Sequence, residues 1–273
     1  MPTQVKEGTA PSLSVLLCVN RTSQYLAEAV RSVLSQDDSD FEFLIAANAC
    51  NDALIEELQI LAGGDPRVRI FRTAIGQLSF NLNFLADQAA GDYLIRMDAD
   101  DISEPSRIRV LRAALANWHP DVLGSWVRFI DDSGRHIGNF KLPTEPSDII
   151  RKLPKGTVFC HPSVAIRKDF LLSMGGYLGG FVSEDTDLWI RSVRSGASLR
   201  NIPEYLLRYR IHQEQSIAAR RGYAEVAAHW LREFLSDPAW YPAKGLAIAL
   251  AKCVFSIPVS KLRRAKVRSG TRK

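Results

Sequence analysis

Short apolar runs alternate with amphipathic segments over the first part of the chain. The runs predict buried strands at residues 13–19, 41–47, 68–73 and 92–97. Between them, apolar residues recur at helical spacing and predict helices at 23–36, 52–64 and 81–90. Strands that alternate with helices at this spacing form crossover units. The pattern therefore predicts an α/β fold with a mainly parallel central sheet and helices on both of its faces.

The pattern loosens after residue 103. The sequence then predicts, in order, a helix at 104–118, a hairpin with strands at 122–130 and 136–142, a short strand and helix closed by Gly175 and Gly176, a helix at 184–196, a strand at 205–212, and only helices from about Gly222. We expect three parts: a flexible N-terminus at 1–12, one α/β domain at 13–212, and a C-terminal helical extension with a basic tail at 213–273.

Composition places the chain among ordinary globular proteins. Of its 273 residues, 46% are hydrophobic and 24% are charged. The four cysteines are scattered and form no C-x-x-C pair, which indicates neither a zinc site nor a disulfide framework and favours a reducing cytoplasm. The polar start MPTQVKEGTAPS lacks the apolar core of a secretory signal, and no run of about 18 apolar residues predicts a membrane span. We therefore expect a cytoplasmic protein.

The net charge of +5 is concentrated towards the C-terminus. Residues 260–273 carry seven Lys and Arg and no acid. They follow an apolar stretch, 245–259, that is interrupted by Lys252 and Pro258. Two interpretations stay open. In the first, the stretch lies in a membrane interface with the basic residues at anionic headgroups, which would make the protein peripheral on the inner face of the cytoplasmic membrane. In the second, the stretch packs on the α/β domain.

Three carboxylates stand within four residues at the end of the strand at 92–97. Asp98 and Asp100 are two residues apart in an extended chain, so their side chains point to the same side. Carboxylate oxygens in this arrangement suit Mg²⁺ or Mn²⁺. The alternative is a solvated loop in which Asp101 or Ser103 caps the next helix. Ligands bind beyond the carboxyl ends of parallel strands, so we expect Asn20 and the loop at 48–52 to lie beside these carboxylates.

Several motifs together resemble the family 2 inverting glycosyltransferases with the GT-A fold. They are LSVLLCVN at 13–20, GDYLIRMDADDIS at 91–103, GGY at 175–177, SEDTDLWIR at 183–191 and LLRYRIH at 206–212, in the family's order. The resemblance implies a GT-A catalytic domain at 13–212. It also implies transfer of a sugar from a nucleotide-diphosphate donor, a UDP-sugar by expectation, to a hydroxyl of a glycan or lipid-linked acceptor, with inversion, in bacterial surface polysaccharide synthesis.

The resemblance assigns roles to individual residues. Asp98 and Asp100 match the D-x-D that holds a divalent metal against the donor diphosphate, and His212 matches a position that assists metal or diphosphate binding in some members. Asp185 matches the usual general base. The remaining assignments are Asn20, Asn48, Asp52 and Asp98 for the donor, and His161, Glu184 and Trp189 on the acceptor side. Ala47 and Asn48 stand where relatives carry two acids, so the nucleotide base is not implied.

The same residues also admit structural roles. Glu184 and Asp185 begin a predicted helix, where acids are favourable beside the N-terminal dipole. Trp189 alone is more typical of core packing than of a sugar shelf. Asp187 and Arg191 are spaced i,i+4, which predicts a surface ion pair that contributes a few tenths of a kcal/mol.

Two other functions are compatible with parts of the sequence. A metal-dependent nucleotidyltransferase also uses paired aspartates, but it is expected to carry a glycine-rich basic loop after the first strand, and NRTSQYL at 20–26 contains no glycine. A nucleic-acid-binding protein would agree with the pI of about 9.1. However, no binding motif accompanies the basic residues and no aromatics are interleaved with them, so we expect no nucleic-acid partner.

Overall fold

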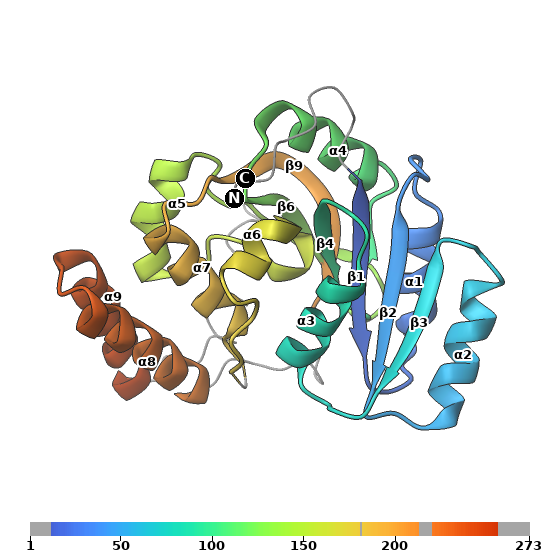
Figure 1. Ribbon diagram of the computed structural model, residues 1–273, viewed down its shortest axis with the longest axis horizontal. Helices are drawn as coiled ribbons and strands as arrows, with labels where there is room; N and C mark the ends of the chain where they lie inside the picture. The colour runs from blue at the N-terminus through green and yellow to red at the C-terminus, as the bar shows by residue number, and fades with distance from the viewer. Residues whose placement is uncertain (1–11, 181, 213–219, 256–273) are drawn as a thin grey trace.

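The computed structural model describes residues 12–180, 182–212 and 220–255. Its centre is a nine-stranded sheet with the order β3-β2-β1-β4-β8-β6-β9-β5, and β7 pairs with β6 (Figure 1). The strands are β1 (Leu13–Val19), β2 (Glu42–Asn48), β3 (Val68–Thr73), β4 (Tyr93–Met97), β5 (Ile102–Ser103), β6 (Val122–Ile130), β7 (His136–Phe140), β8 (Ala165–Arg167) and β9 (Leu199–Arg210).

The first four strands form the predicted parallel sheet. β1 pairs in parallel with both β2 and β4, and β2 pairs in parallel with β3. Beyond β4 the sheet is mixed, because β8 is antiparallel to both β4 and β6 while β6 is parallel to β9. The predicted α/β architecture is confirmed, and its parallel part coincides with the region where strands and helices alternate regularly.

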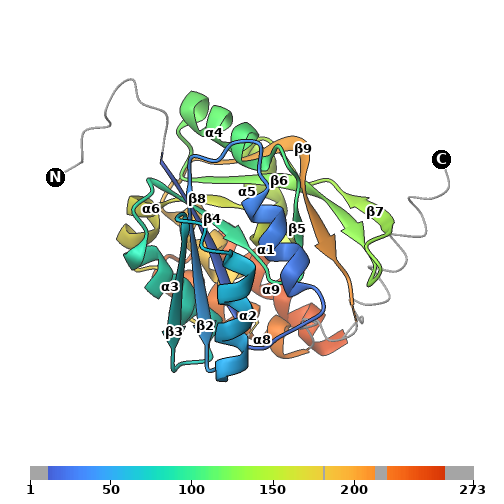
Figure 2. The same ribbon diagram turned by 90° about the vertical axis from the view of Figure 1, so that its right-hand side faces the viewer.

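Helices cover both faces of the sheet (Figures 1 and 2). They are α1 (Leu26–Leu34), α2 (Asp52–Ala62), α3 (Leu78–Gln88), α4 (Arg107–Trp118), α5 (Pro146–Lys152), α6 (Lys168–Ser173) and α7 (Glu184–Arg194), with short 3₁₀ turns η1 (Leu153–Lys155) and η2 (His161–Ser163). Two hydrophobic cores lie on opposite faces of the sheet, and alternate residues of β1 point into them. Leu13, Val15 and Leu17 belong to the core formed with α1, α2 and α4, whereas Leu16 belongs to the core formed with α3, α6 and α7.

The C-terminal extension is a helical hairpin of α8 (Arg220–Ser236) and α9 (Trp240–Phe255) (Figure 1). Gly245 lies against the indole of Trp230, where a Cβ would come within 2.3 Å of the ring, so the two helices approach closely at this point. Ala249 is buried on the same face of α9, but Leu250, Val254 and Phe255 are 49%, 68% and 77% exposed. In the part of the chain that the structure describes, no helix is long and apolar enough to cross a bilayer.

Some predicted boundaries were wrong by a few residues. Helix α1 begins at Leu26, with Tyr25 at its N-cap, three residues after the predicted start at residue 23. The last strand begins at Leu199, six residues before the predicted start, because β9 pairs along most of the long strand β6. Almost all of the predicted flexible N-terminus and the whole basic tail lie outside the described residues.

Candidate active site

Polar side chains follow three neighbouring strands at one edge of the sheet. Asn20 follows β1, Asn48 ends β2 and Asp98 follows β4. These strands are parallel, so their carboxyl ends meet at this edge, as the sequence predicts. Helices α2 and α3 also begin here, after β2 and β3, and helix N-termini favour anions.

The residues of the first two loops differ in accessibility. Asn48 is 6% exposed, and its Nδ2 donates to the backbone oxygen of Val19 at 3.1 Å, which ties β2 to β1. Asp52 is exposed at the start of α2 and pairs with Arg72 at 2.5 Å. Asn20 is exposed as well. Of the three predicted donor residues in these loops, Asn20 and Asp52 are therefore accessible, and Asn48 belongs to the wall of the site.

Three carboxylates gather after β4. Oxygen atoms of Asp98, Asp100 and Asp101 lie within 4.8 Å of one another. Nε2 of His212, which follows β9, lies 2.8 Å from Oδ2 of Asp100. Burial raises the pKa of Asp100, and the neighbouring Asp98 charge raises it further. The structure thus brings together the three predicted metal-binding residues Asp98, Asp100 and His212.

Asp101 completes this cluster, although the sequence analysis did not assign it to the metal. It is 1% exposed, and its Oδ1 accepts a hydrogen bond from the backbone N–H of Arg210 at 2.8 Å. Its Oδ2 is buried and has no hydrogen-bond partner among the described residues. Burial and the charges of Asp98 and Asp100 raise its pKa well above the ordinary value. A divalent cation fits this donor set, because it would supply the missing partner and offset the repulsion.

Arg96 is the buried cation of the site. It lies in β4, is 3% exposed, and its Nη2 is 2.5 Å from Oδ1 of Asp98. Burial disfavours its charge, but the neighbouring acidic groups, Asp98 foremost, together outweigh that effect and raise the pKa of Arg96. Burial raises the pKa values of Glu184 and Asp185, and the charge of Arg96 opposes part of that rise. The sequence motifs give Arg96 no role, although a charged residue inside a predicted buried strand is a visible signal.

Two more buried arginines hold the loops in place. Arg107 donates from Nη2 to the backbone oxygens of Arg96 and Pro162, both at 2.8 Å, and so joins β4 to η2. Burial lowers the pKa of Arg107 to about 10. Arg210, in β9, donates from Nε to the backbone oxygen of Asp100 at 2.9 Å. Together these contacts link β4 to η2, and link the segment that carries Asp98, Asp100 and Asp101 to β9.

Glu184 and Asp185 begin α7. Asp185 accepts hydrogen bonds at Oδ1 from the N–H and the hydroxyl of Thr186, at 2.6 and 3.2 Å. Burial raises the pKa of Glu184 to about 7, and the charge of Asp185 contributes to the rise. Burial also raises the pKa of Asp185. Two adjacent acids with raised pKa values are typical of groups that exchange protons near neutral pH.

His161 and Trp189 form an aromatic group beside Glu184. Nε2 of His161 lies 2.9 Å from the hydroxyl of Tyr177, and Nδ1 lies 3.9 Å from Oε1 of Glu184. Burial, aided by the charge of Arg96, lowers the pKa of His161 well below its usual range, so its ring is neutral at pH 7. Trp189 is 3% exposed, with its ring centroid 6.1 Å from that of His161. The three residues predicted for the acceptor side thus lie together.

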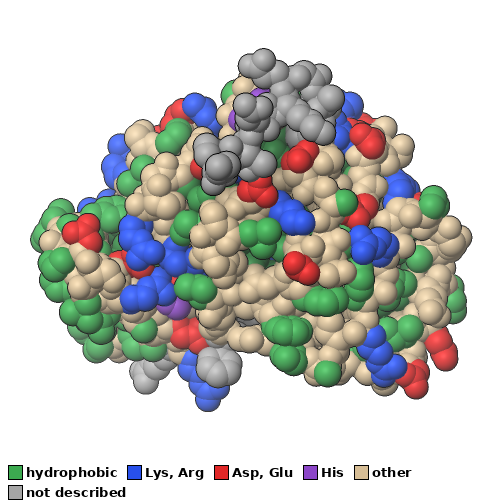
Figure 3. Space-filling view, viewed as in Figure 1, with side chains coloured by type: hydrophobic (Ala, Val, Ile, Leu, Met, Phe, Trp, Pro, Cys, Tyr) green, Lys and Arg blue, Asp and Glu red, His purple; other side chains and the backbone are tan. Residues whose placement is uncertain are grey.

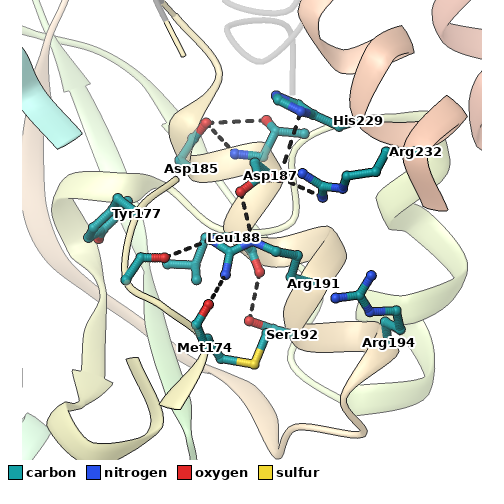
Figure 4. A network of polar contacts seen from close by, with 12 residues as sticks. Met174, Tyr177, Asp185, Asp187, Leu188, Arg191, Ser192, Arg194, His229 and Arg232 are labelled. Carbon is teal, nitrogen blue, oxygen red and sulfur yellow. Dashed lines mark hydrogen bonds and ion pairs between the residues drawn. The ribbon is translucent and has the colours of Figure 1, made fainter. Parts of the chain in front are cut away.

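The predicted surface ion pair of α7 was wrong, because α8 covers it. Asp187 is 0% exposed and lies 2.7 Å from Nε of Arg191, which is 2% exposed. From α8, Nη2 of Arg232 reaches Asp187 at 2.7 Å and Nδ1 of His229 lies 3.6 Å from it (Figure 4). The helix that carries Glu184 is therefore joined to the C-terminal hairpin through this buried carboxylate, and Arg194 of α7 adds a pair with Glu233 of α8 at 2.9 Å.

Comparison with known proteins identifies the family. The model of Glycosyl transferase family 2 matches residues 14–174, more than half of the chain. The chain belongs to this family. WbnJ of Escherichia coli, an O-antigen biosynthesis glycosyltransferase, is 36% identical over 227 residues, which cover 82% of this chain and 89% of WbnJ. Another E. coli relative, the UDP-Gal:alpha-D-GlcNAc-diphosphoundecaprenol beta-1,3-galactosyltransferase, is 32% identical over 142 residues, 52% of this chain and 51% of its own.

Solved structures share the fold of this glycosyltransferase. TarS of S. aureus in complex with UDP-GlcNAc matches with a TM-score of 0.69 and 17% identity, over 91% of this chain and 74% of TarS. The mannosyltransferase PcManGT of Pyrobaculum calidifontis in complex with GDP-Man and Mn²⁺ matches with a TM-score of 0.63 and 17% identity, over 90% and 70%. The GT-A-like fold with C-terminal helices, expected from the motifs, is confirmed.

Proposed function

We propose that this glycosyltransferase moves a sugar from a nucleotide-diphosphate donor to a hydroxyl acceptor with inversion of the anomeric carbon. The observation that carries the proposal is the arrangement around Arg96. Asp98, a member of the carboxylate cluster that fits a cation, pairs with this guanidinium at 2.5 Å, and the charge of Arg96 also acts on the acids Glu184 and Asp185. One site therefore offers both a place for a leaving diphosphate and a proton acceptor.

Donor binding is proposed at the sheet edge. Asp98, Asp100 and Asp101, with His212 beside them, would hold Mn²⁺ or Mg²⁺, which when bound offsets negative charge on the leaving diphosphate. Asn20 and Asp52 are accessible to the nucleotide, and the N-terminus of α3 faces the same edge. A UDP-sugar is the proposed donor, which agrees with the UDP-GlcNAc bound to TarS.

Asp185 is the proposed general base. Its carboxylate takes the proton of the acceptor hydroxyl while that oxygen attacks the anomeric carbon and the diphosphate leaves from the opposite side. Thr186 holds one oxygen of Asp185 with two hydrogen bonds, which orients the carboxylate. A single displacement of this kind inverts the anomeric configuration. His161 and Trp189 remain proposed acceptor-side residues.

The acceptor is proposed to be a glycan or lipid-linked glycan of bacterial surface polysaccharide synthesis, as the functions of the two E. coli relatives suggest. We place the enzyme at the cytoplasmic face of the membrane. Apolar side chains gather on the surface of the α8–α9 hairpin, seen at the left of Figure 3. Leu250 and Val254, one helical turn apart on α9, are 49% and 68% exposed and would enter the lipid interface.

The base is tested with Asp185→Asn, which keeps the shape of the side chain but accepts no proton. We expect transfer to fall about 10²–10⁴-fold, while the thermal shift given by UDP- and GDP-sugars with Mn²⁺ is unchanged. Asp169→Asn, at an exposed acid in the first turn of α6, is the matched control and should keep full activity. Loss of donor binding in Asp185→Asn would reject the base role. NMR that shows a retained anomeric configuration in the product would reject the single displacement.

Membrane binding is tested by liposome flotation. The full-length protein should float with phosphatidylglycerol vesicles, and the double variant Leu250→Glu/Val254→Glu should not. Ile60→Glu is the control, because Ile60 is 79% exposed on α2, outside the hairpin. Equal flotation of the wild type and the double variant, or no flotation of the wild type, contradicts the membrane proposal.

A further inference from the structure

The proposed base is oriented by hydrogen bonds, because packing leaves room beside it. Asp185 is half-buried and lines a cavity of about 200 Å³, to which Lys252 of α9 also contributes. A carboxylate that borders open space is not fixed in one rotamer by its neighbours. Oδ1 of Asp185 accepts from the N–H and the hydroxyl of Thr186, at 2.6 and 3.2 Å. The orientation of the base therefore depends on the N–H of Thr186 staying available to it.

The N–H of Thr186 is a group that a helix cap ordinarily binds. Thr186 is the third residue of α7, and Ser183 is the N-cap of that helix. A serine at an N-cap typically accepts from the N–H of the second or third helical residue. Ser183 makes no such bond, and its backbone, at φ −142° and ψ 26°, lies outside the extended region that capping residues adopt. Asp185 thus takes the N–H that the side chain of Ser183 leaves unused.

Helix α8 holds the side chain of Ser183 instead. The Ser183 hydroxyl is buried, donates to Oε2 of Glu225 at 2.8 Å and lies 3.1 Å from Nε2 of His229. The same oxygen of Glu225 accepts from the backbone N–H of Val182 at 3.2 Å. Burial lowers the pKa of His229, so its ring is neutral at pH 7. Because the hydroxyl hydrogen of Ser183 points to Glu225, the ring donates to the hydroxyl oxygen from Nε2.

These three contacts keep Ser183 out of the capping conformation. Glu225 and His229 fix the hydroxyl on the side of α8, and the bond from Val182 fixes the backbone just before it. Without them, Ser183 is free to adopt the extended backbone of a normal cap, and its hydroxyl then competes for the N–H of Thr186. An N–H that turns to the cap no longer orients the neighbouring carboxylate.

We propose that Glu225, supported by His229, is a positioning residue for the proposed base, Asp185. It holds the Ser183 hydroxyl away from α7 and so leaves the N–H of Thr186 to the carboxylate of the base. The proposal rests on the proposed function for the role of Asp185, whereas the choice of partner at Thr186 is a property of the folded chain alone. The C-terminal hairpin then contributes to the rate of the reaction as well as covering α7.

Two variants that break the same contact should differ in rate. The probe is the release of nucleoside diphosphate from UDP- and GDP-sugars in water with Mn²⁺. Glu225→Ala frees the hydroxyl to cap α7 and should slow release about tenfold, because a bond that orients the base is lost. Ser183→Ala also loses the contact with α8 but has no hydroxyl with which to cap, so it should slow release less than about twofold. The double variant Ser183→Ala/Glu225→Ala should match Ser183→Ala.

Two further variants complete the set. Glu225→Gln keeps an acceptor oxygen and should recover most of the rate that Glu225→Ala loses. Glu56→Ala, at an exposed glutamate of α2, is the control and should react like the wild type. Glu225 is only half-buried, so its truncation should leave the protein folded. Donor binding, measured by thermal shift, should be the same in all of these variants.

The amide signal of Thr186 reports its hydrogen bond without any need for activity. In NMR of the protein labelled at threonine nitrogen, this signal should follow the titration of Asp185 between pH 4 and pH 8, and Asp185→Asn identifies that response by removing it. Glu225→Ala should lose the response, and Ser183→Ala/Glu225→Ala should regain it. If the wild type releases no diphosphate, the proposed donor chemistry fails and the Thr186 signal alone decides the role of Glu225.

Three results would overturn the proposal. The first is a Thr186 response in Glu225→Ala equal to that of the wild type. The second is equal slowing in Glu225→Ala and Ser183→Ala, which would mean that both variants only loosen the packing of α7 on α8. The third is a lost Thr186 response with an unchanged rate. Full activity of Asp185→Asn would instead reject the base in the proposed function and leave the result at Thr186 standing.

Discussion

Replacing Glu184 by glutamine should stabilise the protein at alkaline pH and have little effect at acidic pH. The carboxyl is 9% exposed, and burial together with the charge of Asp185 raises its pKa from 4.5 to about 7. A raised pKa means that the folded protein binds this proton more tightly than the unfolded chain. The contribution of Glu184 to stability is therefore fully present below pH 4.5 and is lost as the pH rises to about 7.

The size of the effect follows from the two values. At about 1.4 kcal/mol for each pKa unit, the rise from 4.5 to about 7 corresponds to about 3 kcal/mol. Glutamine is uncharged at every pH and has nearly the same shape, so it does not carry this cost. The free energy of unfolding of Glu184→Gln, minus that of the wild type, should therefore increase by about 3 kcal/mol between pH 4.5 and pH 8.

Urea denaturation at pH 4.5, 5.5, 6.5, 7.5 and 8 with a chelator present measures this difference. Glu56→Gln is the control, because Glu56 is exposed on α2, and its difference from the wild type should show no comparable trend. A Glu184→Gln difference that is constant over the whole pH range would refute the reasoning. A trend in the opposite direction would mean that the folded protein stabilises the charged form of Glu184.

Three further predictions concern the buried charges. Asp100→Ala should abolish Mn²⁺ binding measured by calorimetry. The free energy of unfolding in chelator should stay almost unchanged, since the variant removes one of three repelling carboxylates. Mn²⁺ binding equal to that of the wild type contradicts the metal role. Arg96→Met should lower the free energy of unfolding by about 3–5 kcal/mol because it leaves buried carboxylates without their cation, and Arg96→Lys should recover part of that loss. Equal denaturation midpoints of Arg96→Met and the wild type would show that the charge is not needed. Asp187→Asn should lower the free energy of unfolding by about 3 kcal/mol or more because Arg191 and Arg232 lose their shared partner. A loss of only a few tenths of a kcal/mol would agree with a surface pair instead.

Much of the fold could be predicted from local pattern. The alternation of Leu13, Val15 and Leu17 with Leu16 determines which core each side of β1 enters, because successive side chains of a strand point to opposite faces. The loops after β1, β2 and β4 meet because parallel strands end at one edge. The mixed half of the sheet was less predictable, since the long pairing of β6 with β9 joins segments about 80 residues apart.

Motif order likewise determined the candidate residues but not their surroundings. The position of Asp98 and Asp100 after a strand is a local property and was visible in the sequence. The hydrogen bond that holds Oδ1 of Asp101 comes from Arg210, which lies 109 residues away in the sequence. The charge of Arg96 acts on Glu184 only through the packing of distant segments, since the two residues are 88 apart in the sequence.

The sequence by itself thus determined the strands, the helices and the edge of the sheet where polar loops gather, because backbone geometry imposes its period on nearby residues. Only the tertiary structure decided the burial of Asp187, which becomes wholly enclosed when α8 covers α7. It also decided that the α8–α9 hairpin both covers the domain and encloses a cavity that Asp185 and Lys252 share. Burial and electric field depend on every element that packs around a group, and that packing is a sum of long-range contacts that no local pattern contains.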